Sequence, residues 1–173
     1  MGGHPDPRRR VELAPLDLAA AVRAGLEPLT HTAETKSITI ANCIGSVTAL
    51  GDEALVRMVI RNLASNAIKF ARRGGVVELT AAPVRIEPAD AASPAPMVRV
   101  TVRDDGVGMS GAALANLIAL EPTISTPGTS GEKGTGIGLY LCRDIVERHG
   151  GTVTVESTPG VGTSIHFTLP AAL

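Results

Sequence analysis

Apolar residues recur along this chain with two different periods, and together the periods predict a mixed α/β fold. Recurrence every three or four residues predicts helices over 13–32, 52–71, 110–120 and 139–149, with Pro28 expected to kink or end the first. Alternation of apolar and polar residues predicts strands over 37–41, 46–50, 76–82, 98–103, 152–156 and 163–169. Successive strands are expected to form hairpins, and 83–96 is expected to be a long, loose connection.

The helix predicted over 52–71 has two distinct faces. Asp52 is a plausible N-cap, because its carboxylate can accept a hydrogen bond from an N–H group of the first turn. At about 100° per residue, one buried stripe is formed by Val56, Ile60, Leu63, Ala64 and Ala67. A polar ridge of Asn62, Asn66 and Lys69 runs along the edge of that stripe.

This polar ridge suggests chemistry beyond helix formation. Asparagine is a poor residue for a helix interior, and burying its amide is unfavourable unless the amide is hydrogen-bonded. An amide oxygen can ligate a hard cation such as Mg²⁺, which shares its other ligand positions with water and substrate phosphates. The ammonium group of Lys69 could contact those phosphates. The alternative is a solvated polar edge that contains two incidental asparagines.

The strand predicted over 98–103 ends in an acidic and glycine-rich stretch. Asp104 and Asp105 are followed by Gly106 and Gly108, and glycines of this kind let a ligand approach the backbone. A carboxylate here could accept a hydrogen bond from an exocyclic amino group such as that of adenine. The alternative is an ordinary Asp-Gly turn. A calcium loop is excluded, because apolar residues interrupt the required oxygen ligands.

A second glycine-rich stretch, 134–139, directly precedes the last predicted helix. A turn of this kind offers free N–H groups and the positive end of a helix dipole, which are favourable for phosphate. Its spacing is G-x-G-x-G and no strand precedes it, so a dinucleotide fingerprint is unlikely, and the P-loop order of residues is also absent. A tight turn packed closely on its neighbour remains the alternative.

Composition limits the remaining possibilities. The length of 173 residues suits one domain with a substantial core, and a net charge of −1 gives no support to nonspecific nucleic-acid binding. Apolar runs are too short for a membrane span, and no signal peptide is expected. Cys43 and Cys142 are expected to be reduced thiols in the core of a cytoplasmic domain. Residues 1–10 are expected to be a disordered end or a cloning remnant.

The order of these motifs resembles the catalytic ATP-binding domain of bacterial sensor histidine kinases, within the superfamily of gyrase, HSP90, MutL and these kinases. The residues that carry the resemblance are the N box at 62–70, the G1 box at 104–108, the G2 box at 134–139, and the later His149-Gly150-Gly151 and Gly160-x-Gly162-Thr163. It implies a two-layer α/β sandwich of the Bergerat type. This fold has a mixed, mostly antiparallel sheet, about three helices on one face and a flexible ATP lid over about 110–134. The domain is expected to span 11–170, followed by a tail over 171–173.

The resemblance also implies roles for individual residues. Asn66 is expected to hold Mg²⁺, while Asn62, Lys69 and Lys133 are expected to lie near the phosphates and to serve catalysis. Asp104 is expected to accept the adenine amino group, with Thr163 nearby through water. The other residues expected to contact or shape the site of ATP or ADP are Phe70, Gly106, Gly108, Gly134, Thr135, Gly136, Gly138 and Leu139.

Several departures from the family pattern are informative. Asn62 stands where the superfamily's ATPases carry a general-base Glu, and an amide cannot take a proton at neutral pH. Asp105 stands where many relatives have Asn, and the Phe-rich F box is missing from the lid. The phosphoacceptor motif is also missing, so each of His4, His31, His149 and His166 is expected to be a surface or core-edge residue.

The resemblance therefore implies a protein-histidine kinase of a two-component system. It would donate the γ-phosphoryl group of Mg·ATP to a histidine on a separate helical dimerisation and phosphotransfer domain, with a response regulator downstream. The isolated domain is expected to be monomeric and cytoplasmic. A free cytoplasmic protein and the cytosolic part of a membrane-anchored sensor both stay open for its parent. The alternatives are a degenerate nucleotide-binding module that signals by docking, an ATPase of the superfamily, and an anti-sigma type serine kinase, which the residue at position 62 disfavours.

Overall fold

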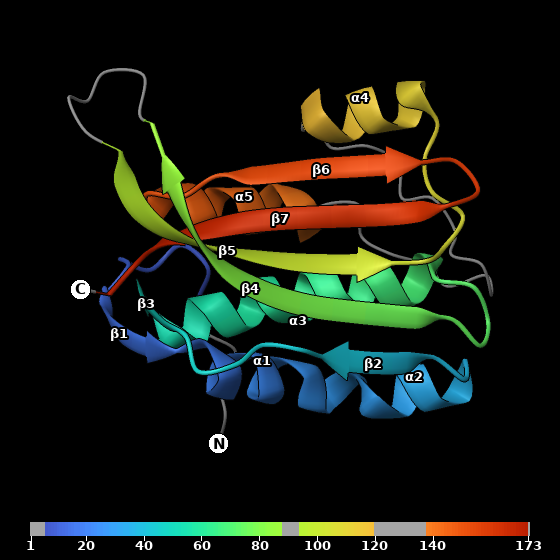
Figure 1. Cartoon of the computed structure of the whole chain (residues 1–173), viewed down its shortest axis with the longest axis horizontal. Helices are drawn as coiled ribbons and strands as arrows, with labels where there is room; N and C mark the ends of the chain where they lie inside the picture. Colours follow the sequence, from blue (N-terminus) through green and yellow to red (C-terminus); the bar gives the residue numbers. More distant parts are fainter. Residues whose placement is uncertain (1–5, 88–93, 120–137, 173) are drawn as a thin grey trace.

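A five-stranded sheet with helices packed on one face forms the body of the molecule (Figure 1). The computed structural model describes residues 6–87, 94–119 and 138–172, with only the backbone over 116–119. The helices are α1 (Leu18–Leu26), the 3₁₀ turn η1 (Glu27–Leu29), α2 (Thr30–Thr35), α3 (Glu53–Phe70), α4 (Gly111–Ala119) and α5 (Gly138–Arg148). The strands are β1 (Ala14–Asp17), β2 (Thr39–Asn42), β3 (Thr48–Gly51), β4 (Val76–Ile86), β5 (Ala95–Asp104), β6 (Val153–Thr158) and β7 (Gly162–Pro170).

The large sheet has the order β2-β4-β5-β7-β6. The pair of β2 and β4 is parallel and the other three pairs are antiparallel, so the predicted mixed, mostly antiparallel sheet is confirmed. The short strands β1 and β3 form a separate antiparallel sheet. Ala171, which the sequence places in a tail, pairs with Ala49 and links the two sheets.

The prediction of one helix over 13–32 is wrong at its start. Residues 14–17 form β1, and the helix begins only at Leu18, where the Asp17 carboxylate accepts a hydrogen bond from Ala20 N at 3.1 Å. Pro15 explains the boundary, because a proline lacks the N–H group that a helix interior needs. Pro28 has the predicted effect of interrupting the helix and lies in the η1 turn.

The predicted hairpin of 37–41 with 46–50 is also wrong. β2 pairs with β4, and β3 pairs with β1. The connection predicted over 83–96 is shorter than expected, because β4 continues to Ile86 and β5 starts at Ala95. The hairpin of β6 and β7 and the pairing of β4 with β5 are confirmed.

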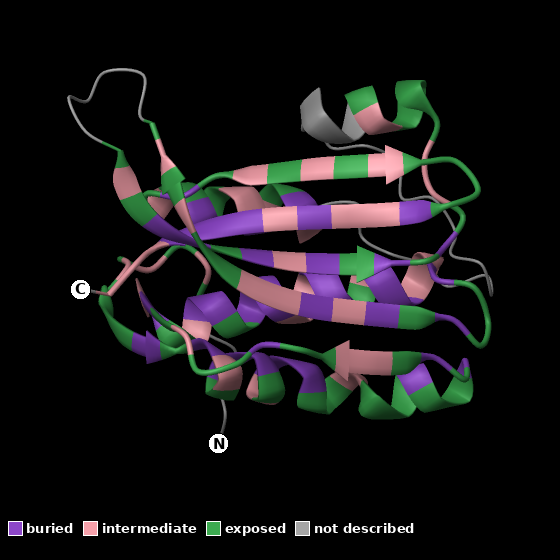
Figure 2. Cartoon of the chain, in the orientation of Figure 1, coloured by how far each residue is buried: buried purple, intermediate pink, exposed green. Residues whose placement is uncertain are grey.

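Aliphatic side chains between the sheet and the helices form the core, and burial alternates along the strands (Figure 2). All five residues of the predicted α3 stripe are buried, and Phe167 of β7 is fully buried beneath the helices. Cys142 is buried as predicted, but Cys43 is exposed. Cys43 directly follows the short edge strand β2, where the chain leaves the sheet, so the apolar residues around it do not enclose it.

The start of α3 is held by a cluster of polar contacts. The buried Asp52 caps the helix through Leu55 N at 3.3 Å, as predicted, and its carboxylate also meets Arg9 Nη2 at 2.5 Å. Asp52 N donates to His149 Nε2 at 3.0 Å. His149 Nδ1 donates to Ile145 O at 2.7 Å, so the ring carries its proton on Nδ1. His149 is therefore a fully buried structural residue, and Arg9 is anchored although it lies in the stretch predicted to be disordered.

The end of α3 is held by Lys36, a buried lysine with 4% exposure. Its Nζ donates to Ile68 O at 3.0 Å and to Lys69 O at 2.7 Å. The last carbonyls of a helix have no partner within the helix and carry the negative end of its dipole. The lysine therefore satisfies this end of α3 and favours it electrostatically.

Replacing Lys36 with Met is expected to lower the free energy of unfolding by about 2 kcal/mol, because buried carbonyl groups lose a charged donor. Chemical denaturation of the two proteins measures this difference. Arg57→Met, an exposed change on the same helix, is the control and is expected to alter stability by less than about 0.5 kcal/mol. Equal effects of the two changes would contradict the role of Lys36.

Candidate functional site

Helices α3 and α5 lie side by side and run in opposite directions. Asp52, at the start of α3, contacts His149 just beyond the end of α5, and Val59 O lies 3.8 Å from Cys142 Sγ in the middle of both. Later residues of α3 thus contact earlier residues of α5, as expected for antiparallel helices. Because both helices rise by about 1.5 Å per residue, this register places Leu63 across from Gly138 at the start of α5, and Asn66 about one turn beyond that start.

The polar ridge of α3 begins beside Cys142. Burial raises the pKa of the Cys142 thiol to about 12, and a hydrogen bond with the Asn62 side chain acts in the opposite direction. Asn62 and Asn66 are both half-buried. The ridge therefore faces α5, the helix that follows the glycine-rich stretch. Asn62 lies beside its first turns, and Asn66 lies about one turn beyond its start.

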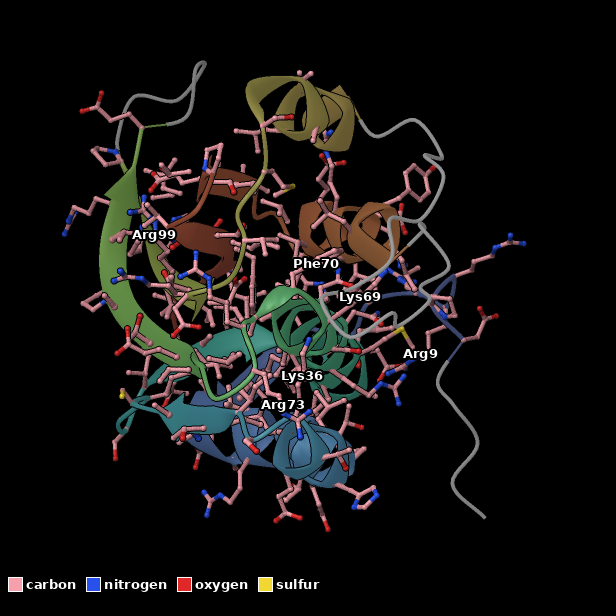
Figure 3. All side chains as sticks on the ribbon, turned by 90° about the vertical axis from the view of Figure 1, so that its right-hand side faces the viewer. Arg9, Lys36, Lys69, Phe70, Arg73 and Arg99 are labelled. Atoms are coloured by element: carbon pink, nitrogen blue, oxygen red, sulfur yellow. The ribbon has the colours of Figure 1, made fainter. Side chains whose placement is uncertain are left out.

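Lys69 and Phe70 complete the ridge at the last turn of α3. Figure 3 shows Lys69 and Phe70 at the last turn of α3, on the side of α3 that is toward α5. The Lys69 Nζ atom lies 4.9 Å from the centre of the Phe70 ring, and both side chains are half-buried. An ammonium group at this distance from an aromatic face is attracted to it, which limits the positions that the lysine takes.

Asp104 ends β5 with a buried carboxyl group. Burial is the main cause that raises its pKa to about 6, and the charge of neighbouring Asp105 also raises the pKa. Hydrogen bonds from the N–H groups of Gly106 and Thr163 lower the pKa. The Gly106 donor lies 2.9 Å from Asp104 Oδ1. A carboxylate has about four acceptor positions, so these two backbone donors leave capacity for a further amino group.

Thr163 lies directly opposite Asp104 in the pairing of β5 and β7. Its hydroxyl oxygen is 2.8 Å from Ser157 Oγ, which also accepts a hydrogen bond from Met109 N at 2.8 Å. Ser157 therefore ties the loop after Asp104 to Thr163. Ser157 is not among the residues identified from the sequence. This residue continues the alternation of the predicted strand 152–156 on its half-buried side, and that alternation could have identified it.

The glycines around Asp104 let other parts of the protein backbone approach closely. A Cβ atom on Gly106 would fall inside van der Waals contact with Phe70 O, and one on Gly108 would collide with Thr158 O. A Cβ atom on Gly162 would collide with Asp104 O. Gly108 and Gly162 also have φ values of +67° and +143°, which disfavour other residues. These contacts bring Asp104 to the end of α3, so the predicted G1 and N boxes form one region.

Replacing Gly106 with Ala is expected to destabilise the fold by about 3 kcal/mol, because the new methyl group forces the loop away from Phe70. The measurement is the midpoint of thermal unfolding. Gly45→Ala, at an exposed position with open space for a Cβ atom, is the matched control and is expected to change little. A Gly106→Ala protein with unchanged stability would contradict this close packing.

Asp105 has a structural contact of its own. Its Oδ1 atom accepts a hydrogen bond from Val76 N at 3.1 Å, at the start of β4. The side chain is exposed, and its charge raises the pKa of Asp104. The negative charge of Asp105, which was predicted beside the site, therefore affects the ionisation of the Asp104 carboxyl group.

The remaining predicted residues lie at or beyond the start of α5. Gly138 begins α5 and Leu139 is buried in the core. Lys133, Gly134, Thr135 and Gly136 lie outside the described residues, so their roles stay predictions. Within the ranges that the structure describes, no cluster of three or more His, Cys, Asp or Glu side chains could hold a metal, and no helix is long and apolar enough to cross a membrane.

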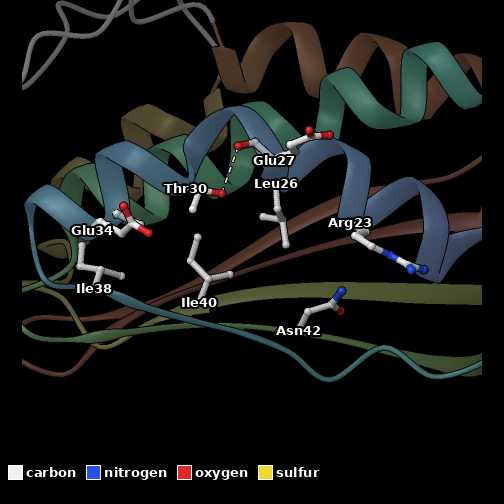
Figure 4. A pocket seen from close by; sticks show the side chains of 9 residues that line it. Arg23, Leu26, Glu27, Thr30, Glu34, Ile38, Ile40 and Asn42 are labelled. Atoms are coloured by element: carbon white, nitrogen blue, oxygen red, sulfur yellow. Dashed lines mark hydrogen bonds between the residues drawn. The ribbon is translucent and has the colours of Figure 1, made fainter.

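A cavity of about 600 Å³ lies elsewhere, between helices α1 and α2 and strand β2 (Figure 4). Its floor is apolar, with Leu26, Ile38 and Ile40, and its rim carries Arg23, Glu27 and Glu34. None of the residues that line it belongs to the ridge of α3 or to the loop after Asp104. It therefore does not take part in the candidate site.

Sequence comparison places the chain among known proteins. The model of the family described as histidine kinase-, DNA gyrase B-, and HSP90-like ATPase matches residues 51–173. An uncharacterized sensor-like histidine kinase of Rhizobium meliloti (strain 1021) is 33% identical over 168 residues, which cover 95% of this chain and 30% of that protein. The non-motile and phage-resistance protein of Caulobacter vibrioides is 37% identical, over 69% of this chain and 13% of its own length. The chain thus spans less than a third of these curated relatives.

Solved structures agree with the fold. Full-length ShkA in complex with AMPPNP matches with a TM-score of 0.71 and 31% identity, over 95% of this chain and 32% of that one. The mycobacterial sensor histidine kinase MprB matches with a TM-score of 0.72 and 21% identity, over 92% of this chain and 98% of that one. The predicted α/β sandwich is therefore confirmed.

Proposed function

Because this chain belongs to the family of histidine kinase-, DNA gyrase B-, and HSP90-like ATPases, we propose that it binds Mg·ATP and transfers the γ-phosphoryl group to a histidine on a separate helical dimerisation and phosphotransfer domain. The observation that supports this most directly is the junction of the α3 ridge with Asp104. The close approach of Gly106 to Phe70 O brings the buried Asp104 carboxyl group to the end of α3, where the half-buried Lys69 also lies. An acceptor for a base and a cation for phosphate thus share one region.

Each residue has a specific role in this proposal. Asp104 accepts a hydrogen bond from the adenine amino group, and Thr163, held by Ser157, orders the water beside it. Phe70 offers an apolar ring to the nucleotide. Lys69 meets the phosphates as a point charge, supported by Lys133 and the backbone N–H groups of 134–139.

Asn66 fits a magnesium site, because it offers a half-buried amide oxygen about one turn beyond the start of α5. Mg²⁺ takes few ligands from the protein and shares the rest with phosphates and water, so one amide is a sufficient anchor. When bound, the ion neutralises the charge on the phosphates. Asn62 sits beside Cys142 and offers no carboxylate to take a proton from water. This arrangement favours transfer to a partner over hydrolysis.

In the transfer step, a lone pair of the acceptor imidazole nitrogen attacks the γ-phosphorus. The bond to the bridging oxygen breaks, and ADP leaves with the electron pair. Catalysis of this kind depends mainly on positioning and on charge neutralisation. Lys69 would neutralise phosphate charge directly, and Asn66 would hold the ion that neutralises the rest. The partners in this proposal are the phosphotransfer domain and a downstream response regulator, in a cytoplasmic two-component system. The solved structure of full-length ShkA is a complex with AMPPNP, and this likeness supports the nucleotide.

The test begins with nucleotide binding by this chain. Millimolar Mg·ATP is expected to raise the melting temperature and to shift NMR signals of residues 66–70 and 104–108. A folded sample that shows neither change would exclude the proposed function. The second stage adds γ-labelled ATP, alone and with a histidine-containing dimerisation domain.

Label is expected on histidine only when the dimerisation domain is present. The isolated chain is expected to release ADP far more slowly than the value of about 10 s⁻¹ that is typical of enzymes. ADP release near that value would instead identify an ATPase. Nucleotide binding without transfer to any supplied domain would favour a module that signals by docking.

A further inference from the structure

Three chain segments that are distant in sequence meet beside Asp104 in a closed ring of hydrogen bonds. Val107 N donates to Phe70 O at 3.3 Å, and Gly160 N donates to Val107 O at 2.8 Å. Arg72 Nη2 then donates to Gly160 O at 2.6 Å, and Arg72 is two residues from Phe70, which closes the ring. The ring thus joins the end of α3, the loop after β5 and the turn between β6 and β7.

Arg72 supplies the only side chain in this ring. The other two bonds use backbone atoms, so no substitution of a side chain removes them directly. The turn that Arg72 holds is tight, with φ of +76° at Gly160 and a hydrogen bond from Val161 N to Thr158 O at 3.0 Å. A guanidinium group bound to a carbonyl oxygen is a charge-assisted contact, stronger than a bond between neutral groups.

The turn is connected directly to the residues that surround Asp104. β7 begins at Gly162, whose Cα atom packs against the carbonyl group of Asp104, and the next residue, Thr163, pairs with Asp104. Thr158, on the other side of the turn, packs against Gly108 in the same way. A shift of the turn away from α3 would therefore move both the Thr163 hydroxyl group and the loop that follows Asp104.

We propose that Arg72 is a positioning residue for base recognition, which sets the geometry between Asp104 and Thr163 by holding Gly160 against the end of α3. The inference rests on the proposed binding of ATP. It assigns adenine selectivity in part to a residue outside the boxes that carry the resemblance. Arg72 is exposed and acts through the turn, so it need not touch the nucleotide.

The test compares Arg72→Gln with Arg72→Lys and with Arg73→Gln, a change at the exposed neighbouring arginine. Calorimetry measures the Kd values of Mg·ATP and Mg·GTP for each protein. Arg72→Gln is expected to reduce the preference for ATP over GTP by about 5-fold, as loss of one charge-assisted bond allows. Arg72→Lys is expected to recover part of that preference, and Arg73→Gln is expected to keep all of it.

Amide hydrogen exchange gives a readout that needs no nucleotide. Arg72→Gln is expected to speed exchange at Val107 and Gly160, whose N–H groups lie in the ring. An unchanged ATP preference in Arg72→Gln, or equal weakening of ATP and GTP, would overturn the inference while the proposed function stands. A wild-type chain that binds no nucleotide would overturn both.

Discussion

Replacing Asp104 with Asn is expected to abolish the preference for ATP over GTP and to weaken ATP binding by about 10- to 100-fold. The reason is that the carboxylate only accepts hydrogen bonds, as the adenine amino group requires, whereas an amide can also turn a donor toward the base. A hydrogen bond to a charged group is worth about 1.5–3 kcal/mol, which gives this range. Calorimetry with both nucleotides measures the change.

Asp105→Asn is the matched control, because the amide oxygen can still accept the hydrogen bond from Val76 N. The Asp105→Asn protein is expected to retain the preference for ATP over GTP. If Asp104→Asn still discriminated ATP from GTP as well as the wild type, Asp104 would not be the residue that recognises the base.

The raised pKa of Asp104 also predicts a pH dependence of binding. With a pKa of about 6, the carboxyl group is mostly ionised at pH 7.5 and gains a proton as the pH falls toward 5.5. ATP affinity is therefore expected to fall through this window. Asp105→Asn removes a charge that raises the pKa, so its midpoint is expected to lie at lower pH. Calorimetry at several pH values compares the two proteins.

The same pKa predicts a gain in stability from Asp104→Asn. A group with a pKa of 3.8 in the unfolded chain and about 6 in the folded protein binds protons more tightly when folded. Folding stability then falls as the pH rises from about 4 to 6, and the ionised carboxylate destabilises the folded protein at pH 7. Asp104→Asn is expected to raise the melting temperature at pH 7 without nucleotide; a lower value would contradict the desolvation of Asp104.

Replacing Asn66 with Ala is expected to remove the magnesium dependence of ATP binding. The metal loses its amide ligand, so the affinity for Mg·ATP is expected to fall by about 10-fold or more. The affinity measured in the presence of a chelator is expected to stay near that of the wild type. Calorimetry with and without Mg²⁺ separates the two contributions.

Ser65→Ala, on the exposed side of the same turn, serves as the control for this change. It is expected to bind Mg·ATP like the wild type, because the residue points away from α5. A magnesium dependence that is the same in Asn66→Ala as in the wild type would show that the ion is held by other residues.

The sequence predicts the elements of this fold better than their partners. The α3 pattern was readable because the N-cap, the apolar stripe and the final glycines all agree over many residues. The strand over 46–50 was correctly identified as a strand, but its partner is β1 rather than β2. Local alternation fixes which side of a strand is buried and does not choose among distant neighbours. The sequence does not predict the strand over 14–17, because its four residues continue the apolar pattern of α1.

Candidate site residues were predictable where an unusual residue type stands at an expected core boundary or strand end. Asn66 and Asp104 both meet that condition. Lys36, Arg72 and Ser157 do not, because the first two act on backbone carbonyls at least 32 residues away and the third links two segments of the sheet. Contacts of this kind leave no periodic signal. The expectations for 120–137 lie outside the described residues and stay predictions.

The two ends of α3 are fixed by separate sets of contacts, with Asp52, Arg9 and His149 at one end and Lys36 at the other. A helix that is fixed at both ends is rigid, so the backbone positions of Asn62, Asn66 and Lys69 keep a constant spacing. In the proposed function, the metal ligand Asn66 and the phosphate-binding Lys69 therefore would not adjust independently to nucleotides of different length. The proposal then expects parts of the protein other than α3 to distinguish ATP from ADP.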